Sequence, residues 1–411
     1  MTQPHIDLLI AGGGIGGLAT ALAVARTGRR VHLVERAEAF GEIGAGLQIG
    51  PNATRALDEL GLLDGVLDTA VKPRRGIIFD AVTGEKLTTL DFGEKFLERY
   101  GHPYIVTHRR DLLDVLLKAC QEEENITLSN GRELVAVQED DDKVTVEFKD
   151  GDVWTCDLII GADGLKSKVR TLIDETQPVF HGHVAFRGTV PTEQVADFIS
   201  SEDVALWIGP GLHLMQYPVR GGTLYNQVAV IESPRYAAGR SDWGTSEELH
   251  EVFAQTCGPV RRSVDMIEAE RGTPVSDREP SDTWSSKRAV LIGDAAHAML
   301  QYLGQGACQA LEDALSLAGH LDQAEEDLPL TAIKGYEQDR IERASRCQRV
   351  ARPWGALWHT RDETTLALRN RYFKQRADDD YTELDWLYSP SINATPNAEG
   401  KKYETGQLHH V

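Results

Sequence analysis

A glycine-rich turn near the N-terminus has the residue spacing that binds a pyrophosphate. Gly12, Gly14 and Gly17 form GxGxxG between an apolar run and an Ala/Leu-rich segment. Glycines at these positions permit a tight turn, backbone approach to a pyrophosphate, and packing of a helix on a strand. Glu35 ends a second apolar run, where its carboxylate can accept hydrogen bonds from a ribose diol. The order predicts a dinucleotide-binding unit; the alternative is a glycine-rich turn with a surface glutamate.

Two later segments favour FAD over a nicotinamide cofactor alone. Asp163 follows one brief apolar run and Gly293-Asp294 follows another, and a simple dehydrogenase requires neither. Asp294 can bind the ribityl or pyrophosphate region, while a helix predicted to begin at Gly306 and Ala307 would direct its free N–H groups at the flavin. Because reduced flavin carries negative charge at its N1/C2 carbonyl edge, these donors would stabilise it.

A third group of residues combines a candidate base with hydrogen-bond donors. Residues 212–218 alternate as a strand does, which places His213, Met215 and Tyr217 on one face. An imidazole of ordinary pKa, about 6.5, suits removal of a phenolic proton, although a core histidine satisfied by the backbone is the alternative. Tyr104 and Tyr217 can donate hydrogen bonds to a buried carboxylate, or they are ordinary half-buried aromatic residues.

The elements that must position these residues follow from apolar periodicity. Helical spacing predicts helices over 51–67, with Asn52 as the cap, and over 111–123. Alternation on both sides of residues 149–152 predicts a hairpin, and 179–230 is strand-like. Phe186 and Trp207 are expected, with Met215, to line the apolar wall of the substrate pocket, or else to belong to the core.

Nucleotide-binding elements therefore occur early, in the middle and late in the chain, with β-rich material between them. This order predicts an α/β fold in which a GxGxxG FAD-binding Rossmann-like domain is interleaved with a β-rich substrate domain, followed by a C-terminal helical segment. The expected ranges are 1–72, 101–178 and 276–350 for the FAD-binding domain, 73–100 and 179–275 for the substrate domain, and 351–411 for the C-terminal helix and a loosely packed tail.

Composition limits the partners and the compartment. The 411 residues carry a formal net charge of -21, which disfavours nucleic acid and anionic lipid surfaces as partners. Without a long apolar stretch or an export signal, a soluble cytoplasmic protein is expected. The five cysteines have no spacing typical of a zinc site or a disulfide framework, so reduced thiols and no bound metal are expected.

Taken together, the three motifs resemble those of the single-component FAD-dependent aromatic hydroxylases that use NAD(P)H, such as the salicylate and hydroxybenzoate monooxygenases. The resemblance extends from residue 5 to about residue 388. It implies that NAD(P)H reduces the flavin, that O2 adds to give a C4a-hydroperoxide, and that this species hydroxylates an electron-rich ring. It also implies that Arg36 contacts the adenosine part, that Leu47-Gln48 and Arg109 contact FAD, and that Asp163 serves both FAD and NAD(P)H. A homodimer is expected by analogy alone.

The resemblance also bears on the substrate. His213 and Gln301 occur where 3-hydroxybenzoate 6-hydroxylases carry a histidine and a glutamine beside the substrate ring, whereas many salicylate hydroxylases have proline in place of Gln301. Residues 304–306, Gly-Gln-Gly, instead follow the salicylate-hydroxylase pattern. The best prediction is conversion of 3-hydroxybenzoate to gentisate. Alternatives are salicylate 1-monooxygenase giving catechol, a flavin-dependent epoxidase or oxidase acting on another ring substrate, and a flavin-binding protein without turnover.

Overall fold

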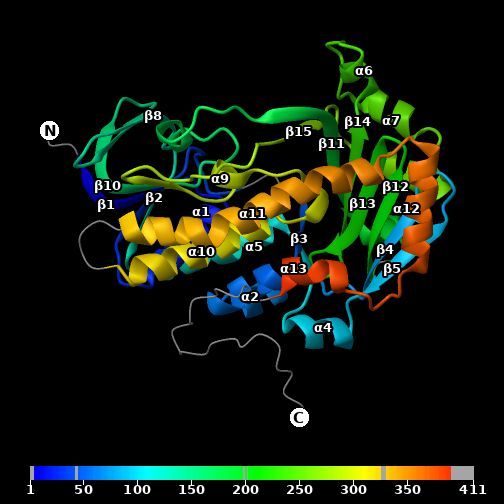
Figure 1. The fold of residues 1–411 in the computed structure, drawn as a ribbon, viewed down its shortest axis with the longest axis horizontal. Helices are drawn as coiled ribbons and strands as arrows, with labels where there is room; N and C mark the ends of the chain where they lie inside the picture. The colour runs from blue at the N-terminus through cyan, green and yellow to red at the C-terminus, as the bar shows by residue number, and fades with distance from the viewer. Residues whose placement is uncertain (1–3, 42–44, 198–199, 201, 325–329, 390–411) are drawn as a thin grey trace.

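Two large sheets organise the molecule. The computed structural model describes residues 4–41, 45–197, 200, 202–324 and 330–389. Figure 1 shows the two sheets at opposite ends, with long helices lying across the space between them. This arrangement confirms the mixed α/β class, whereas the residue ranges assigned above to the two domains stay a prediction.

The first sheet has the strand order β7-β2-β1-β10-β9-β8, and β16 also pairs with β10. Its strands are β1 (His5–Ala11), β2 (Val31–Val34), β7 (Ile126–Ser129), β8 (Leu134–Glu139), β9 (Val144–Phe148), β10 (Val153–Gly161) and β16 (Ala289–Leu291). β1 lies parallel to β2 and β10, and β10 lies parallel to β16. The three parts of the chain that carry nucleotide-binding motifs therefore meet in one parallel region. The hairpin predicted around 149–152 is confirmed as the antiparallel pair β9 and β10.

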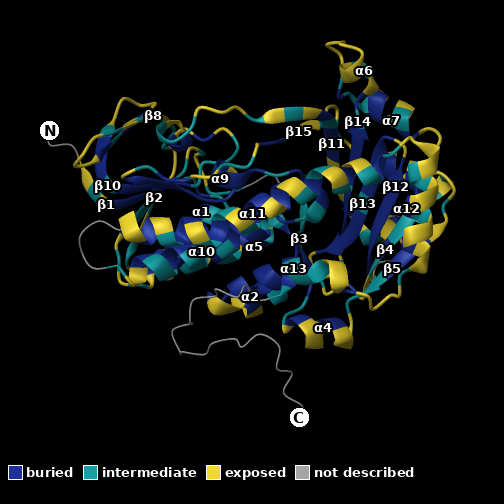
Figure 2. Ribbon diagram, viewed as in Figure 1, coloured by how far each residue is buried: buried dark blue, intermediate teal, exposed yellow. Residues whose placement is uncertain are grey.

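Helices cover this sheet because their apolar faces need a partner. The first of them, α1 (Ile15–Ala25), has ten buried residues and packs against α5 (Arg109–Glu122) and α10 (Gly306–Asp322). Alongside α10 runs α11 (Leu330–Trp358), which continues toward the second sheet (Figure 1). The central strands of both sheets are mostly buried (Figure 2). α11 thus joins the two halves of the fold.

The second sheet has the order β15-β11-β14-β13-β12-β4-β5. Its strands are β4 (Arg75–Asp80), β5 (Lys86–Asp91), β11 (Val179–Pro191), β12 (Asp203–Gly209), β13 (Leu212–Val219), β14 (Leu224–Glu232) and β15 (Thr273–Asp277). One face packs under α7 (Ser246–Phe253) and α8 (Gly258–Val264), around Leu214 and Phe253. The opposite face is turned toward α11 and α12 (Glu363–Gln375). Only this second face can contribute to a site between the sheets.

Short elements close the remaining gaps. The strands β3 (Gly46–Ile49) and β6 (Ile105–His108) pair in a two-stranded sheet. The other helices are α2 (Pro51–Glu59), α3 (Leu63–Leu67), α4 (Glu94–Tyr100), α6 (Pro234–Ala237), α9 (Asp294–His297) and α13 (Asp385–Tyr388), with 3-10 turns η1 (Val169–Leu172), η2 (Thr192–Gln194), η3 (Gln301–Leu303) and η4 (Thr382–Leu384). None of the helices in the described parts of the chain combines the length and apolarity of a membrane span.

The predicted helix over 51–67 is wrong in two details. It is split into α2 and α3, because Gly61 adopts a left-handed conformation with φ of 62° between them. Its N-cap is Gly50 and not Asn52, whose side chain donates hydrogen bonds to Gln305 and Glu312. The five cysteines are free, and four of them are buried. The tail predicted for the last twenty residues lies outside the described residues.

Candidate active site

One cavity runs from the first sheet to the second. It has a volume of about 1140 Å³ and is lined at one end by Gly14 and Gly16 of the glycine-rich turn and at the other by His213 and Tyr217. Pockets for small molecules typically measure about 300–1,000 Å³. The cavity is therefore large enough for an extended cofactor together with a small ring compound.

The glycine-rich turn is packed as the spacing predicts. Gly12 has φ of 113°, and a Cβ placed on it would lie 2.3 Å from the carbonyl oxygen of Ala162 at the end of β10. A Cβ on Gly17 would lie 1.9 Å from the carbonyl oxygen of Gly12. Gly14 is the N-cap of α1 and faces the cavity. The free N–H groups at the start of α1 thus open onto the cavity, as an anion-binding turn requires.

Glu35 lies against this turn and holds its shape. One carboxylate oxygen accepts from the Gly13 N–H at 2.7 Å and the other from the Ala37 N–H at 2.9 Å. The next residue, Arg36, is exposed. Contacts of Glu35 with a ribose and of Arg36 with adenosine stay predictions; of the two side chains, that of Glu35 contacts the turn directly.

The predicted flavin contacts gather in the middle of the cavity. Leu47, Gln48, Asp294, Gly306 and Ala307 all line it. Asp294 opens α9 and is exposed, and the backbone of Gly306 begins α10, so both helix starts are directed at the same region. Binding of the ribityl chain and the flavin carbonyl edge by these donors and the carboxylate stays a prediction.

Arg109 also lines this part of the cavity. Burial lowers the pKa of its guanidinium, and the charge of Asp294 partly offsets that effect. A largely enclosed cation of this kind favours an anionic group in the cavity.

Asp163 is placed differently from the other predicted cofactor residues. One carboxylate oxygen accepts from the backbone N–H groups of Lys168 and Val169, at 2.6 and 3.2 Å, and so holds the start of η1. Burial raises the pKa of Asp163 despite these hydrogen bonds. Its neighbours Ala162 and Gly164 line the cavity. A direct contact with FAD or NAD(P)H therefore stays a prediction, and the structure supplies a positioning role.

Strand alternation correctly groups the residues at the substrate end. His213, Met215 and Tyr217 of β13 all line the cavity. Of the two alternatives for Phe186 and Trp207, the pocket wall is wrong and the core is right, because both pack in the core on the opposite face of the sheet. Their strand neighbours Arg187 and Leu206 line the cavity, and adjacent residues of a strand point to opposite faces.

His213 is the candidate base, and it is 2% exposed. Its Nδ1 lies 2.7 Å from Nε2 of His359, so its partner is a side chain and not the backbone. Burial, together with the nearby His359 and His183, lowers the pKa of His213 well below 6.5. The imidazole is therefore neutral at neutral pH, which is the form that accepts a proton, and Nε2 is the nitrogen left to serve the cavity.

Arg187 of β11 is a functional candidate that the sequence analysis missed. It lines the cavity, and its Nη2 donates to Oε1 of Gln301 at 2.9 Å. Burial lowers its pKa, and Tyr217 lies close enough to oppose that shift. The only sequence signal is a single arginine on the inward phase of the strand 179–191. A guanidinium here is suited to pair with a substrate carboxylate.

The two predicted tyrosines have different roles in the structure. The Tyr104 hydroxyl donates to Oε1 of Gln48 at 2.6 Å, and its ring stacks on Phe92 with centroids 4.4 Å apart. Burial raises the pKa of both Tyr104 and Tyr217, so both are neutral hydrogen-bond donors. Tyr217, beside Arg187, is the better placed of the two for a carboxylate, while Tyr104 fixes the amide of Gln48.

Two other histidines, His297 and His108, have structural roles. His297 is fully buried, with Nε2 2.6 Å from Oδ2 of Asp313. His108 caps α5 by accepting from the Arg110 N–H.

Comparison with known proteins agrees with this geometry. Residues 5–351 match the family described as an FAD binding domain. A 3-hydroxybenzoate 6-hydroxylase of Polaromonas naphthalenivorans (strain CJ2) is 35% identical over 388 residues, which cover 94% of this chain and 96% of that protein. A 3-amino-4-hydroxybenzoate 2-monooxygenase of Streptomyces cremeus is 36% identical over 391 residues, with coverage of 94% and 96%. The solved structure of a salicylate hydroxylase substrate complex matches with a TM-score of 0.76 and 26% identity, over 94% of this chain and 95% of that one.

Proposed function

This chain belongs to the FAD-dependent aromatic hydroxylases, and we propose that its reaction is the conversion of 3-hydroxybenzoate to gentisate. The observation that carries the substrate class is the pairing of a base with a cation at one end of the cavity. His213 is neutral and buried, and Arg187 and Tyr217 line the same end. Such a site suits a ring that has both a phenolic hydroxyl and a carboxylate.

FAD fits the rest of the cavity. The turn at Gly12, Gly14 and Gly17 would hold the pyrophosphate, with Glu35 and Arg36 toward the ADP half. Asp294, Gln48 and the helix start at Gly306 would hold the ribityl chain and the ring. When bound, FAD takes electrons from NAD(P)H and activates O2, so that one oxygen atom enters the ring and the other leaves as water. The protein supplies binding, orientation and a path for the substrate proton.

The residues at the far end would prepare the substrate for that attack. Nε2 of His213 takes the phenolic proton, which makes the ring a better nucleophile. Arg187 and Tyr217 hold the carboxylate, and the ring is oriented between them and the flavin. Gln301 receives a hydrogen bond from Arg187 through Oε1, which leaves its NH₂ group to donate to the substrate oxygen.

Replacing Arg187 tests the carboxylate partner. Arg187→Met is expected to raise the KM for 3-hydroxybenzoate about 10- to 100-fold, because a charge-assisted hydrogen bond to a carboxylate contributes about 1.5–3 kcal/mol. Binding of a phenol without a carboxylate should change little. Steady-state kinetics give the KM for 3-hydroxybenzoate, and titration of the holoenzyme gives the affinities for both ligands. An equal loss of affinity for the two ligands would show that Arg187 has another role.

The product assay tests the function itself. Consumption of NADH and NADPH by the purified yellow protein is followed with and without 3-hydroxybenzoate and salicylate, and products are identified by chromatography. We expect stimulation by 3-hydroxybenzoate with gentisate as the product. Catechol formed from salicylate would instead identify the enzyme as a salicylate 1-monooxygenase. The match to the structure of a salicylate hydroxylase favours this second candidate. Stimulation by neither compound would overturn the benzoate assignment.

A further inference from the structure

Behind His213 a line of polar groups leads away from the cavity. Nδ1 of His213 lies 2.7 Å from Nε2 of His359, and Nδ1 of His359 lies 3.4 Å from Oε1 of Glu232. His359 is 1% exposed, whereas the Glu232 side chain is 29% exposed. The line therefore begins at the candidate base, passes through a buried imidazole, and ends at a carboxylate that reaches solvent.

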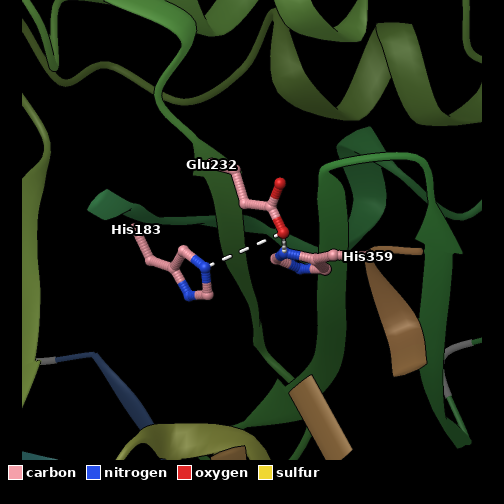
Figure 3. Close-up of side chains that lie close together, drawn as sticks. All are labelled: His183, Glu232 and His359. Atoms are coloured by element: carbon pink, nitrogen blue, oxygen red, sulfur yellow. Dashed lines mark ion pairs between the residues drawn. The ribbon is translucent and has the colours of Figure 1, made fainter. Parts of the chain in front are cut away.

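A second line converges on the same carboxylate. Tyr302, which lines the cavity, lies 2.5 Å through its hydroxyl from Nδ1 of His183, and Nε2 of His183 lies 3.8 Å from Oε1 of Glu232. Figure 3 shows His183 and His359 approaching Glu232 from different elements. Glu232 is thus the shared end of both lines.

The geometry points to a proton relay: we propose that His359 and Glu232 carry the proton taken up by His213 out of the cavity to solvent. This inference rests on the proposed function, because it follows the phenolic proton of the substrate. His359 and Glu232 do not line the cavity, so they would act through His213 as positioning and relay residues. A retained proton would leave a charged imidazolium in a buried position, which is unfavourable without an exit.

The proton transfers balance at each atom. The phenolic O–H bond breaks, an N–H bond forms at Nε2 of His213, and the phenolate oxygen keeps the electron pair. The proton on Nδ1 of His213 passes to Nε2 of His359, and the proton on Nδ1 of His359 passes to Oε1 of Glu232 and then to water. Both imidazoles return to the neutral state, each protonated on the opposite nitrogen, and rotation of the two rings restores the starting tautomers.

The surrounding charges suit this direction of transfer. Burial lowers the pKa of His359, with Glu232 opposing that shift and Arg361 and Arg369 adding to it. The pKa of His183 is lowered to about 4, chiefly by burial. His359, His181 and Arg361 lower it further, and the carboxylate of Glu232 opposes the shift. Although burial raises it, the pKa of Glu232 is lowered to about 2 by the neighbouring His359 and Arg361. Neutral imidazoles can accept a proton, and Glu232, ionised at neutral pH, gives up to water any proton that it receives.

The same three groups also have their ligand atoms within 4.8 Å of one another, as a cation site would. The guanidinium of Arg361 already contacts the other oxygen of Glu232 and opposes a cation there. A chelator should therefore leave proton transfer unchanged.

Proton release on ligand binding tests the relay without turnover. The FAD-loaded enzyme, without NAD(P)H, is mixed in weak buffer with 3-hydroxybenzoate or salicylate in a stopped-flow instrument. The buffer contains a pH indicator, and each measurement is made with and without EDTA. We expect the wild type to release a proton as the phenolate forms. His359→Gln and Glu232→Gln should slow this release about tenfold or more, while benzoate, which has no phenol, binds with unchanged affinity. Glu232→Asp should restore part of the rate.

The matched control is Glu202→Gln, which removes a carboxylate paired with Arg74 far from the relay and should release the proton at the wild-type rate. Release at the wild-type rate in both relay variants would overturn the proposal, as would abolition of release by EDTA in the wild type. If the product assay detects no gentisate but a phenolic ligand still shows slowed release in the variants, the substrate assignment fails and the relay stands.

Discussion

Replacing His213 with alanine is expected to lower kcat for hydroxylation of a phenolic substrate about 10²- to 10⁴-fold. A positioned general base contributes a factor of this size, and His213 is the buried imidazole whose Nδ1 is held by His359 while its other nitrogen serves the cavity. FAD content should stay at the wild-type level, because the glycine-rich turn lies at the other end of the cavity. Single-turnover kinetics with purified holoenzyme measure the effect.

The pH profile provides a second readout. Because burial lowers the pKa of His213 well below 6.5, the neutral, proton-accepting form is present above that lowered pKa and is lost as the pH falls through it. The acid limb of kcat/KM should therefore lie below pH 6.5 in the wild type and disappear in the variant. His250→Ala is the matched control, since His250 is exposed and, among the described residues, its ring nitrogens lie beside the Ser246 carbonyl of its own helix and Asp265. A fully active His213→Ala enzyme would favour an epoxidase or oxidase, which has no phenol to deprotonate.

Replacing Gly12 with alanine is expected to produce a protein that is nearly free of FAD. The added Cβ would lie 2.3 Å from the carbonyl oxygen and 2.6 Å from the carbonyl carbon of Ala162, and backbone atoms cannot rotate away. Overpacking of this kind costs about 1–3 kcal/mol, so displacement of the turn should raise the Kd for FAD about 10- to 100-fold. The flavin absorbance per polypeptide after gel filtration, and titration of the apoprotein with FAD, measure this change.

Gly28→Ala separates steric contact from backbone strain. Gly28 also has a positive φ, of 88°, but a Cβ there meets nothing within 4 Å. The control should lose about 1 kcal/mol of stability and keep its FAD. Equal loss of FAD in the two variants would mean that strain alone, and not the contact with Ala162, explains the result.

Local periodicity was sufficient for the elements that carry the motifs. The GxGxxG spacing predicted the turn and the flanking β1 and α1, because the backbone conformation of such a turn depends on neighbouring residues. Alternation along β13 placed His213, Met215 and Tyr217 together, because side chains in a strand repeat every two residues whatever the sheet. The same rule alone could not say which face of the other strands borders the cavity, so Phe186 and Trp207 were left between the pocket wall and the core.

The sequence by itself therefore determined the family, the nucleotide-binding turn and the group of side chains around His213. Only the tertiary structure decided what lies next to that group. His359 is 146 residues from His213 in the chain, and Arg187 is 114 residues from Gln301. These contacts depend on how α11 and the second sheet pack against each other, and packing between distant segments leaves no periodic signal in a single sequence.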